Sequence, residues 1–182
     1  MIKTFHHLFQ IMNIIFLGTP DFSVGVLKAI YNSHHKILAV VTQPDKPVGR
    51  KKVLTAPPVK QYAQSVNLPV FQYDKIKDEG VQDLIELKPD LMITCAFGQI
   101  LSQEILDIPR LGVINIHASL LPKYRGASPI HYAILNGEKQ TGIIICLTSK
   151  QRHIKTAIWV SLSAKGSKIF PKSLTSLFLR AK

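Results

Sequence analysis

The chain has few cysteines and no long apolar run. Its two cysteines in 182 residues, Cys95 and Cys146, lie in apolar segments and have no metal-ligand spacing, which indicates buried, reduced thiols rather than a disulfide framework or a thiolate metal site. No apolar run approaches the roughly 20 residues that span a bilayer. Residues 1–11 hold no signal-type cleavage site, and Met12 is a second possible start. We therefore predict a cytoplasmic protein that does not bind membranes, with an N-terminal extension over residues 1–11.

Acidic residues are missing from the last quarter of the chain. All 11 Asp and Glu residues lie at or before Glu138, whereas nine of the 23 Lys and Arg residues follow it. The formal net charge of +12 therefore arises mainly after residue 138. Such a tail either binds nucleic acid or is not the sequence with which the domain was built.

What is present is a series of short apolar runs separated by helical patterns. Fully apolar strands alternating with helices are typical of a parallel sheet that is covered on both faces. We predict an α/β fold with a Rossmann-like, open, mostly parallel sheet, whose ligands bind beyond the carboxyl ends of its strands. The predicted strands are 13–17, 37–42, 69–71, 91–96, 112–117 and 141–147, the predicted helices are 21–32, 59–66, 81–87 and 128–135, and 43–58 is predicted to be a loop.

Asn115 and His117 are the first candidates for chemistry. Side chains two apart in a strand share a face, so both should project together from the end of the strand over 112–117. An amide can donate to an oxyanion, and an imidazole can move protons near neutral pH. Considered alone, a histidine at a strand end can equally be a structural residue.

The residues around this pair resemble the folate-dependent formyltransferases. Asn-x-His is followed by Ser-Leu-Leu-Pro-x-Tyr-Arg-Gly-Ala-x-Pro-Ile, ending at Ile130. Upstream, Phe16-Leu-Gly-Thr-Pro-Asp-Phe22 and Thr42-Gln-Pro-Asp-Lys-Pro47 are similar to the methionyl-tRNA members. The resemblance extends from about Met12 to Gly142.

The resemblance implies an activity and a site. The expected reaction transfers a formyl group from the cosubstrate 10-formyltetrahydrofolate to the amine of initiator methionyl-tRNA, in a monomer without a metal. By the same resemblance, Asn115 and His117 are catalytic. The folate-binding residues would be Ser119, Leu120, Leu121 and Pro122, with Phe97, Gly98, Gln99 and Ile100 on the other edge. The alternative interpretation of Phe97 to Ile100 is an ordinary strand-to-helix turn without a ligand.

The basic loop points to the second substrate. Lys46, Arg50, Lys51 and Lys52 lie in a Gly- and Pro-containing stretch. Such a run is often merely solvated, but it can also neutralise phosphates. By resemblance this loop would contact tRNA, and it distinguishes the methionyl-tRNA enzymes from formyltransferases that act on glycinamide ribonucleotide or sugar nucleotides.

The resemblance ends after Ile143. The family continues into an acidic stretch whose Asp completes a catalytic triad, and residues 144–182 contain no acid. We expect 12–143 to be a partial catalytic domain and 144–182 to be a basic tail encoded out of frame, with no C-terminal tRNA-binding domain. We therefore expect the chain to be an impaired fragment of the enzyme. The alternatives are a non-enzymatic remnant that binds tRNA or folate weakly and a different folate-dependent formyltransferase, of the glycinamide ribonucleotide or sugar-nucleotide type.

Overall fold

A computed structural model describes residues 11–126, 128–148 and 157–163. The expected extension over 1–11, apart from its last residue, and most of the expected tail lie outside these residues. The described elements are β1 (Asn13–Gly18), α1 (Asp21–Tyr31), β2 (Lys36–Thr42), β3 (Lys46–Val48), β4 (Val53–Thr55), α2 (Pro58–Ser65), β5 (Val70–Gln72), α3 (Ile76–Glu79), α4 (Val81–Glu86), β6 (Leu91–Cys95), α5 (Gln103–Asp107), β7 (Val113–His117), α6 (Pro129–Leu135), β8 (Gln140–Thr148) and β9 (Ala157–Ser163).

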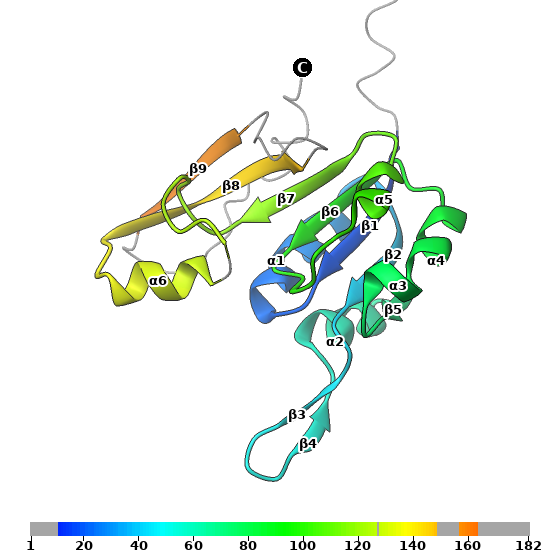
Figure 1. Ribbon diagram of the computed structural model, residues 1–182, viewed down its shortest axis with the longest axis horizontal. Coiled ribbons are helices and arrows are strands. Elements are labelled where there is room, and N and C mark those ends of the chain that lie inside the picture. The colour runs from blue at the N-terminus through cyan, green and yellow to red at the C-terminus, as the bar shows by residue number, and fades with distance from the viewer. Residues whose placement is uncertain (1–10, 127, 149–156, 164–182) are drawn as a thin grey trace, which may run out of the picture.

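One large sheet organises the molecule (Figure 1). Within the described residues its strand order is β5-β2-β1-β6-β7-β8-β9. The four pairings among β5, β2, β1, β6 and β7 are parallel. This confirms the predicted Rossmann-like, mostly parallel sheet. The chain moves from β1 outward to β2 and β5, and then resumes on the other side of β1 at β6.

The apolar strands fill two core layers, one on each face of the sheet. In β1, Ile14 and Phe16 pack with side chains of α1 and α2, whereas Ile15 and Leu17 pack with side chains of α3, α4 and α5. All four β1 side chains are fully buried. Burial on both faces explains why these strands are apolar throughout rather than alternating.

The direction of β8 was left open by the sequence. The strand pairs antiparallel with β7, placing Ile144 opposite His117 and Thr148 opposite Val113. The short helix α6 stays at the carboxyl end of β7, so the chain re-enters the sheet at that end and must run back (Figure 1). A parallel return would need a connection that crosses the length of the sheet. β9 was not expected, and it pairs antiparallel with β8.

The stretch expected to be an irregular loop contains a hairpin. β3 and β4 pair antiparallel with Val48 opposite Val53, and the hairpin projects away from the sheet beyond α2 (Figure 1). Gly49 and Lys52 adopt positive φ in the connecting turn. The sequence also left α3 and α5 unpredicted; Ser102 caps α5 by accepting a hydrogen bond from the Ile105 amide.

Both cysteines are buried and unpaired, as expected. Burial raises the pKa of the Cys95 thiol to about 11. Among the described residues no helix combines the length and apolarity that crossing a membrane requires.

Candidate active site

A cleft of about 720 Å³ opens at the carboxyl ends of β1, β6 and β7. Its position follows from the strand order, because the connections diverge between β1 and β6 and leave a crevice there. The lining residues are Pro20, Phe22, Thr94, Ala96, Phe97, Gly98, Gln99, Leu101, Leu106, Asn115, Ile116, His117, Ala118, Gly126, Ser128, Pro129, Ile130, His131 and Thr148.

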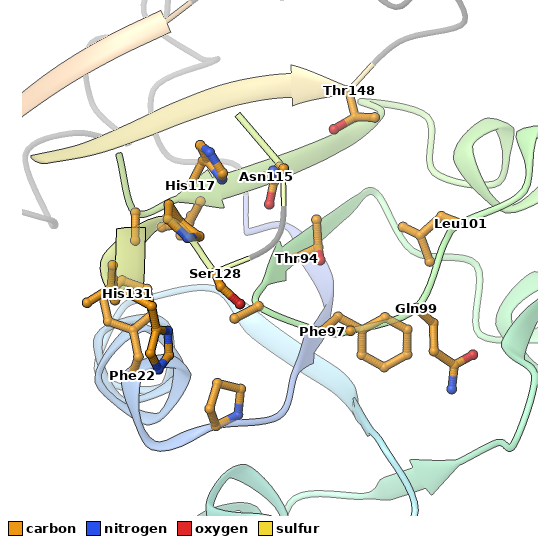
Figure 2. A pocket seen from close by; sticks show the side chains of 18 of the residues that line it. Phe22, Thr94, Phe97, Gln99, Leu101, Asn115, His117, Ser128, His131 and Thr148 are labelled. Carbon is orange, nitrogen blue, oxygen red and sulfur yellow. The ribbon is translucent and has the colours of Figure 1, made fainter. Parts of the chain in front are cut away.

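Asn115 and His117 project from β7 into this cleft together. The side chains between and before them, Ile116 and Ile114, pack on the α1–α2 side of the sheet, so the two polar side chains lie on the opposite face. Both are partly buried. Figure 2 shows them beside the same hollow as Thr94 and Phe97. An amide donor and an imidazole therefore face a shared space large enough for a ligand.

The His117 ring is held by the loop that follows it. Its Nε2 lies 3.2 Å from the backbone carbonyl oxygen of Tyr124. Because a carbonyl oxygen only accepts, the imidazole Nε2–H is the donor in this hydrogen bond.

The turn after β6 forms a fixed wall of the cleft. Ala96 and Gly98 adopt positive φ on either side of Phe97, whose side chain is buried. Thr19 Oγ1 donates to the Phe97 carbonyl oxygen at 2.8 Å. The Gln99 amide accepts from the Ile76 amide and donates to the Tyr73 carbonyl, each at 2.8 Å. The wall is therefore tied both to the turn after β1 and to the segment that starts α3.

The predicted folate-binding residues divide into two groups. Phe97, Gly98 and Gln99 line the cleft. Ile100 points into solvent, with 89% of its surface exposed. The stretch from Ser119 to Pro122 does not line the cleft, and Ser119 is fully buried beside it. The structure thus brings one predicted edge to Asn115 and His117 and leaves the other next to the cleft rather than in its wall.

Several lining residues were not predicted. Thr94 stands opposite Asn115 on the neighbouring strand, and it is the polar residue of the otherwise apolar stretch Leu91–Cys95. That exception was a usable signal. Phe22, His131 and Thr148 also line the cleft, but their approach depends on the placement of α1, α6 and β8.

The predicted tRNA-binding residues lie outside the cleft. Lys46, Arg50, Lys51 and Lys52 are exposed on the β3–β4 hairpin. An ion pair anchors the base of the hairpin, where Lys60 Nζ contacts Asp45 at 2.8 Å and Gln72 donates to the same carboxylate at 2.9 Å. The hydrogen bonds from Lys60 and Gln72 hold the pKa of Asp45 below its usual value. The result is a basic projection on a fixed base.

The described residues contain no group of three or more His, Cys, Asp or Glu side chains arranged to bind a metal ion. The polar side chains that line the cleft include Asn115, His117, Thr94 and His131.

Solved structures share this fold. Glycinamide ribonucleotide transformylase 1 from Symbiobacterium toebii matches with a TM-score of 0.65 at 15% identity, over 84% of this chain and 74% of that one. A formyltetrahydrofolate deformylase from Pseudomonas syringae pv. tomato matches with a TM-score of 0.62 at 18% identity, over 87% of this chain and 54% of that one. At these identities the likeness concerns the fold alone.

Sequence relatives are much closer. A methionyl-tRNA formyltransferase from Macrococcus caseolyticus is 58% identical over 139 residues, which are 76% of this chain and 44% of that protein. Another from Lysinibacillus sphaericus is 49% identical over 166 residues, 88% of this chain and 53% of that protein. The chain thus spans about half the length of these relatives. The formyl transferase family matches residues 12–151, and the chain belongs to that family.

Proposed function

We propose that this chain carries the catalytic part of a methionyl-tRNA formyltransferase, which moves a formyl group from 10-formyltetrahydrofolate to the amine of initiator methionyl-tRNA. The observation that carries the proposal is the shared projection of Asn115 and His117 into one cleft. The names of the sequence relatives support the choice of substrate.

The chemistry requires two functions that this pair can supply. The methionyl amine attacks the formyl carbon and gives a tetrahedral intermediate with a negative oxygen. The Asn115 amide would donate to that oxygen, a contribution of about 10²–10³-fold for one such donor. His117 would take the proton from the attacking nitrogen and pass it to N10 as the C–N10 bond breaks, releasing tetrahydrofolate and formyl-methionyl-tRNA.

The cleft suits a folate cosubstrate. Its volume of about 720 Å³ lies within the range of roughly 300–1,000 Å³ that is usual for ligand pockets. Phe97, Leu101 and Leu106 offer apolar surface to a pterin ring, and the polar groups gather at Asn115 and His117. Ser119 to Pro122, as the loop beside the cleft, remain proposed folate contacts that need a local shift to reach a ligand.

The basic hairpin is the proposed tRNA contact. Lys46, Arg50, Lys51 and Lys52 are exposed, and their charges are not offset by acids within Lys46–Thr55. Side chains of this kind bind phosphates without reading bases, so the hairpin would position the acceptor end while the cleft performs the reaction.

The decisive experiment measures formyl transfer to methionyl-tRNA by the full chain with 10-formyltetrahydrofolate. We expect Asn115→Ala and His117→Ala each to lower the single-turnover rate about 100-fold. Asn32→Ala and His34→Ala are matched controls and should leave the rate unchanged, because both residues are exposed in the turn before β2, at the amino-terminal edge of the sheet rather than at the cleft. Equal rates in all four variants would overturn the assignment, and formylation of glycinamide ribonucleotide in place of methionyl-tRNA would replace it with a purine enzyme.

A second candidate is a non-catalytic protein that retains binding. It is favoured by the lack of any Asp or Glu after Glu138, since the family resemblance implies an acid there. Titrating 10-formyltetrahydrofolate and tRNA by calorimetry separates the two. Binding of both ligands without formyl product supports the second candidate, and product formation at any Asn115-dependent rate rejects it.

A further inference from the structure

The carbonyl that holds His117 belongs to a residue in a constrained conformation. Tyr124 adopts φ of 56°, in the left-handed region that bulky L-residues avoid for steric reasons. A residue stays there only when its surroundings determine its position strongly. Contacts of the Tyr124 side chain would restrain the residue in this conformation, in which its carbonyl faces the His117 ring.

Glu138 supplies these contacts. The Tyr124 hydroxyl donates to Glu138 Oε1 at 2.8 Å, and Asn136 Nδ2 donates to the Tyr124 hydroxyl at 3.2 Å. Lys123 Nζ contacts the same Glu138 oxygen at 3.0 Å. Glu138 is itself fixed just after α6, where its amide donates to the Ala133 carbonyl at 2.9 Å. Contacts from the loop after β7 thus converge on one carboxylate beyond α6.

The ionised form of Glu138 is the one that best accepts a hydrogen bond from the Tyr124 hydroxyl. Hydrogen bonds from Lys123 and Tyr124 hold the pKa of Glu138 below its usual value. Glu138 is therefore ionised at neutral pH, and a hydrogen bond from a hydroxyl to a carboxylate is stronger than one between neutral groups.

The hydrogen bond to the Tyr124 carbonyl determines the tautomer of the His117 ring. Because Nε2 donates to Tyr124, a neutral His117 keeps its proton on Nε2 and leaves Nδ1 as the lone-pair nitrogen. Release of Tyr124 would let the ring rotate and let either nitrogen carry the single proton of the neutral ring.

We propose that Tyr124 and Glu138 form a clasp that positions His117, with Glu138 fixing the tyrosine side chain and the tyrosine carbonyl fixing the tautomer and orientation of the imidazole. That the clasp aids catalysis rests on the proposed function. That the clasp positions the His117 ring does not. Neither residue lines the cleft, so both act through His117.

The test follows the Nε2–H proton of His117 in the full chain by NMR, without folate or tRNA, and assigns the signal by its loss in His117→Gln. We expect Tyr124→Phe and Glu138→Ala to speed its exchange with water about tenfold, as the loss of one hydrogen bond predicts. Glu138→Gln keeps an acceptor oxygen and should restore most of the protection. Tyr31→Phe and Glu86→Ala, exposed residues elsewhere, are the controls.

The outcomes separate this proposal from the proposed function. Unchanged exchange in Tyr124→Phe and Glu138→Ala, with unfolding midpoints equal to wild type, would overturn the clasp whatever the activity. Faster exchange in both variants supports it even if the chain forms no product. Where formyl transfer is measurable, the same variants should lower kcat and leave KM unchanged, since they do not touch a substrate.

Discussion

Two buried serines near the cleft differ in whether their hydroxyls have partners. Ser23 and Ser119 are both fully buried. Ser23 Oγ donates to the Cys95 carbonyl at 2.6 Å, which joins α1 to the end of β6. Ser119 Oγ has no hydrogen-bond partner among the described residues. A buried hydroxyl without a partner lowers stability by the cost of its lost hydration.

Substitution by alanine should therefore act in opposite directions at the two sites. Ser23→Ala should lower the free energy of unfolding by about 1–2 kcal/mol, because it leaves a buried carbonyl with one bond fewer. Ser119→Ala should leave it unchanged or raise it by up to about 1 kcal/mol. Urea unfolding of both variants at one pH provides the comparison. A loss of stability in Ser119→Ala as large as that in Ser23→Ala would mean that the Ser119 hydroxyl has a partner.

At the scale of elements, strand periodicity predicted that the side chains of Asn115 and His117 share one face of the sheet. The alternation along Val113–His117 placed Asn115 and His117 on one face, and the structure has them so. The direction of β8 was not predictable, because it depends on where α6 lies. The hairpin was hidden by its Pro, Gly and Lys content, although the β-branched Val48 and Val53 flank its turn.

The features of the site that the sequence did not predict depend on contacts between elements that are far apart in the chain. Gln99 was expected to bind folate, yet its amide bonds to Ile76 and Tyr73, more than 20 residues earlier in the chain. No local pattern reveals such a bond. The folate-binding role of Ser119 to Pro122 remains a prediction, as do the catalytic roles of Asn115 and His117.

The hairpin gives a prediction about salt. If Lys51 and Lys52 neutralise tRNA phosphates, the double variant Lys51→Gln, Lys52→Gln should reduce the slope of log affinity against log salt by about one to two. Both side chains are exposed, so thermal unfolding should not change. Lys75→Gln, Lys77→Gln is the matched control, with two exposed lysines on the α3 side. Fluorescence titration of tRNA at several salt concentrations measures the slope, and equal slopes in the two double variants would remove the hairpin from the tRNA site.

At the scale of the whole molecule, two carboxylates connect parts of the sheet that are far apart in sequence. Asp90 accepts a hydrogen bond from the Asn13 amide at 2.9 Å and contacts Arg110 at 3.0 Å. It thereby ties the start of β1 to the segment before β7. Asp45 joins the hairpin base to α2 and β5 through Lys60 and Gln72. The hydrogen bond from the Asn13 amide lowers the pKa of Asp90 most, and the hydrogen bond from Arg110 lowers it further. The hydrogen bond from Lys60 lowers the pKa of Asp45 in the same way.

These shifts predict how stability depends on pH. A carboxyl whose pKa is lower in the folded state binds protons more weakly than the same group in the unfolded chain, where its pKa is about 3.9. Its contribution is therefore complete well above pH 4 and is lost as the pH falls through the unfolded and then the folded pKa. Protonation also raises the positive charge of a chain that already carries a formal +12, and self-repulsion adds to the loss.

We therefore expect these two carboxylates to contribute a constant amount to the thermal midpoint from about pH 7 to pH 5, and the midpoint to fall below about pH 4 as they bind protons. Asp90→Asn and Asp45→Asn should lower the midpoint at pH 7 and flatten the fall, because each variant lacks one of the groups that titrate. Exposed Asp74 provides the control variant Asp74→Asn, which should follow wild type throughout. Calorimetry in buffers from pH 3 to pH 7 gives the curves. An acid limb as steep in Asp90→Asn as in wild type would show that Asn13 and Arg110 do not favour the ionised carboxylate in the folded protein.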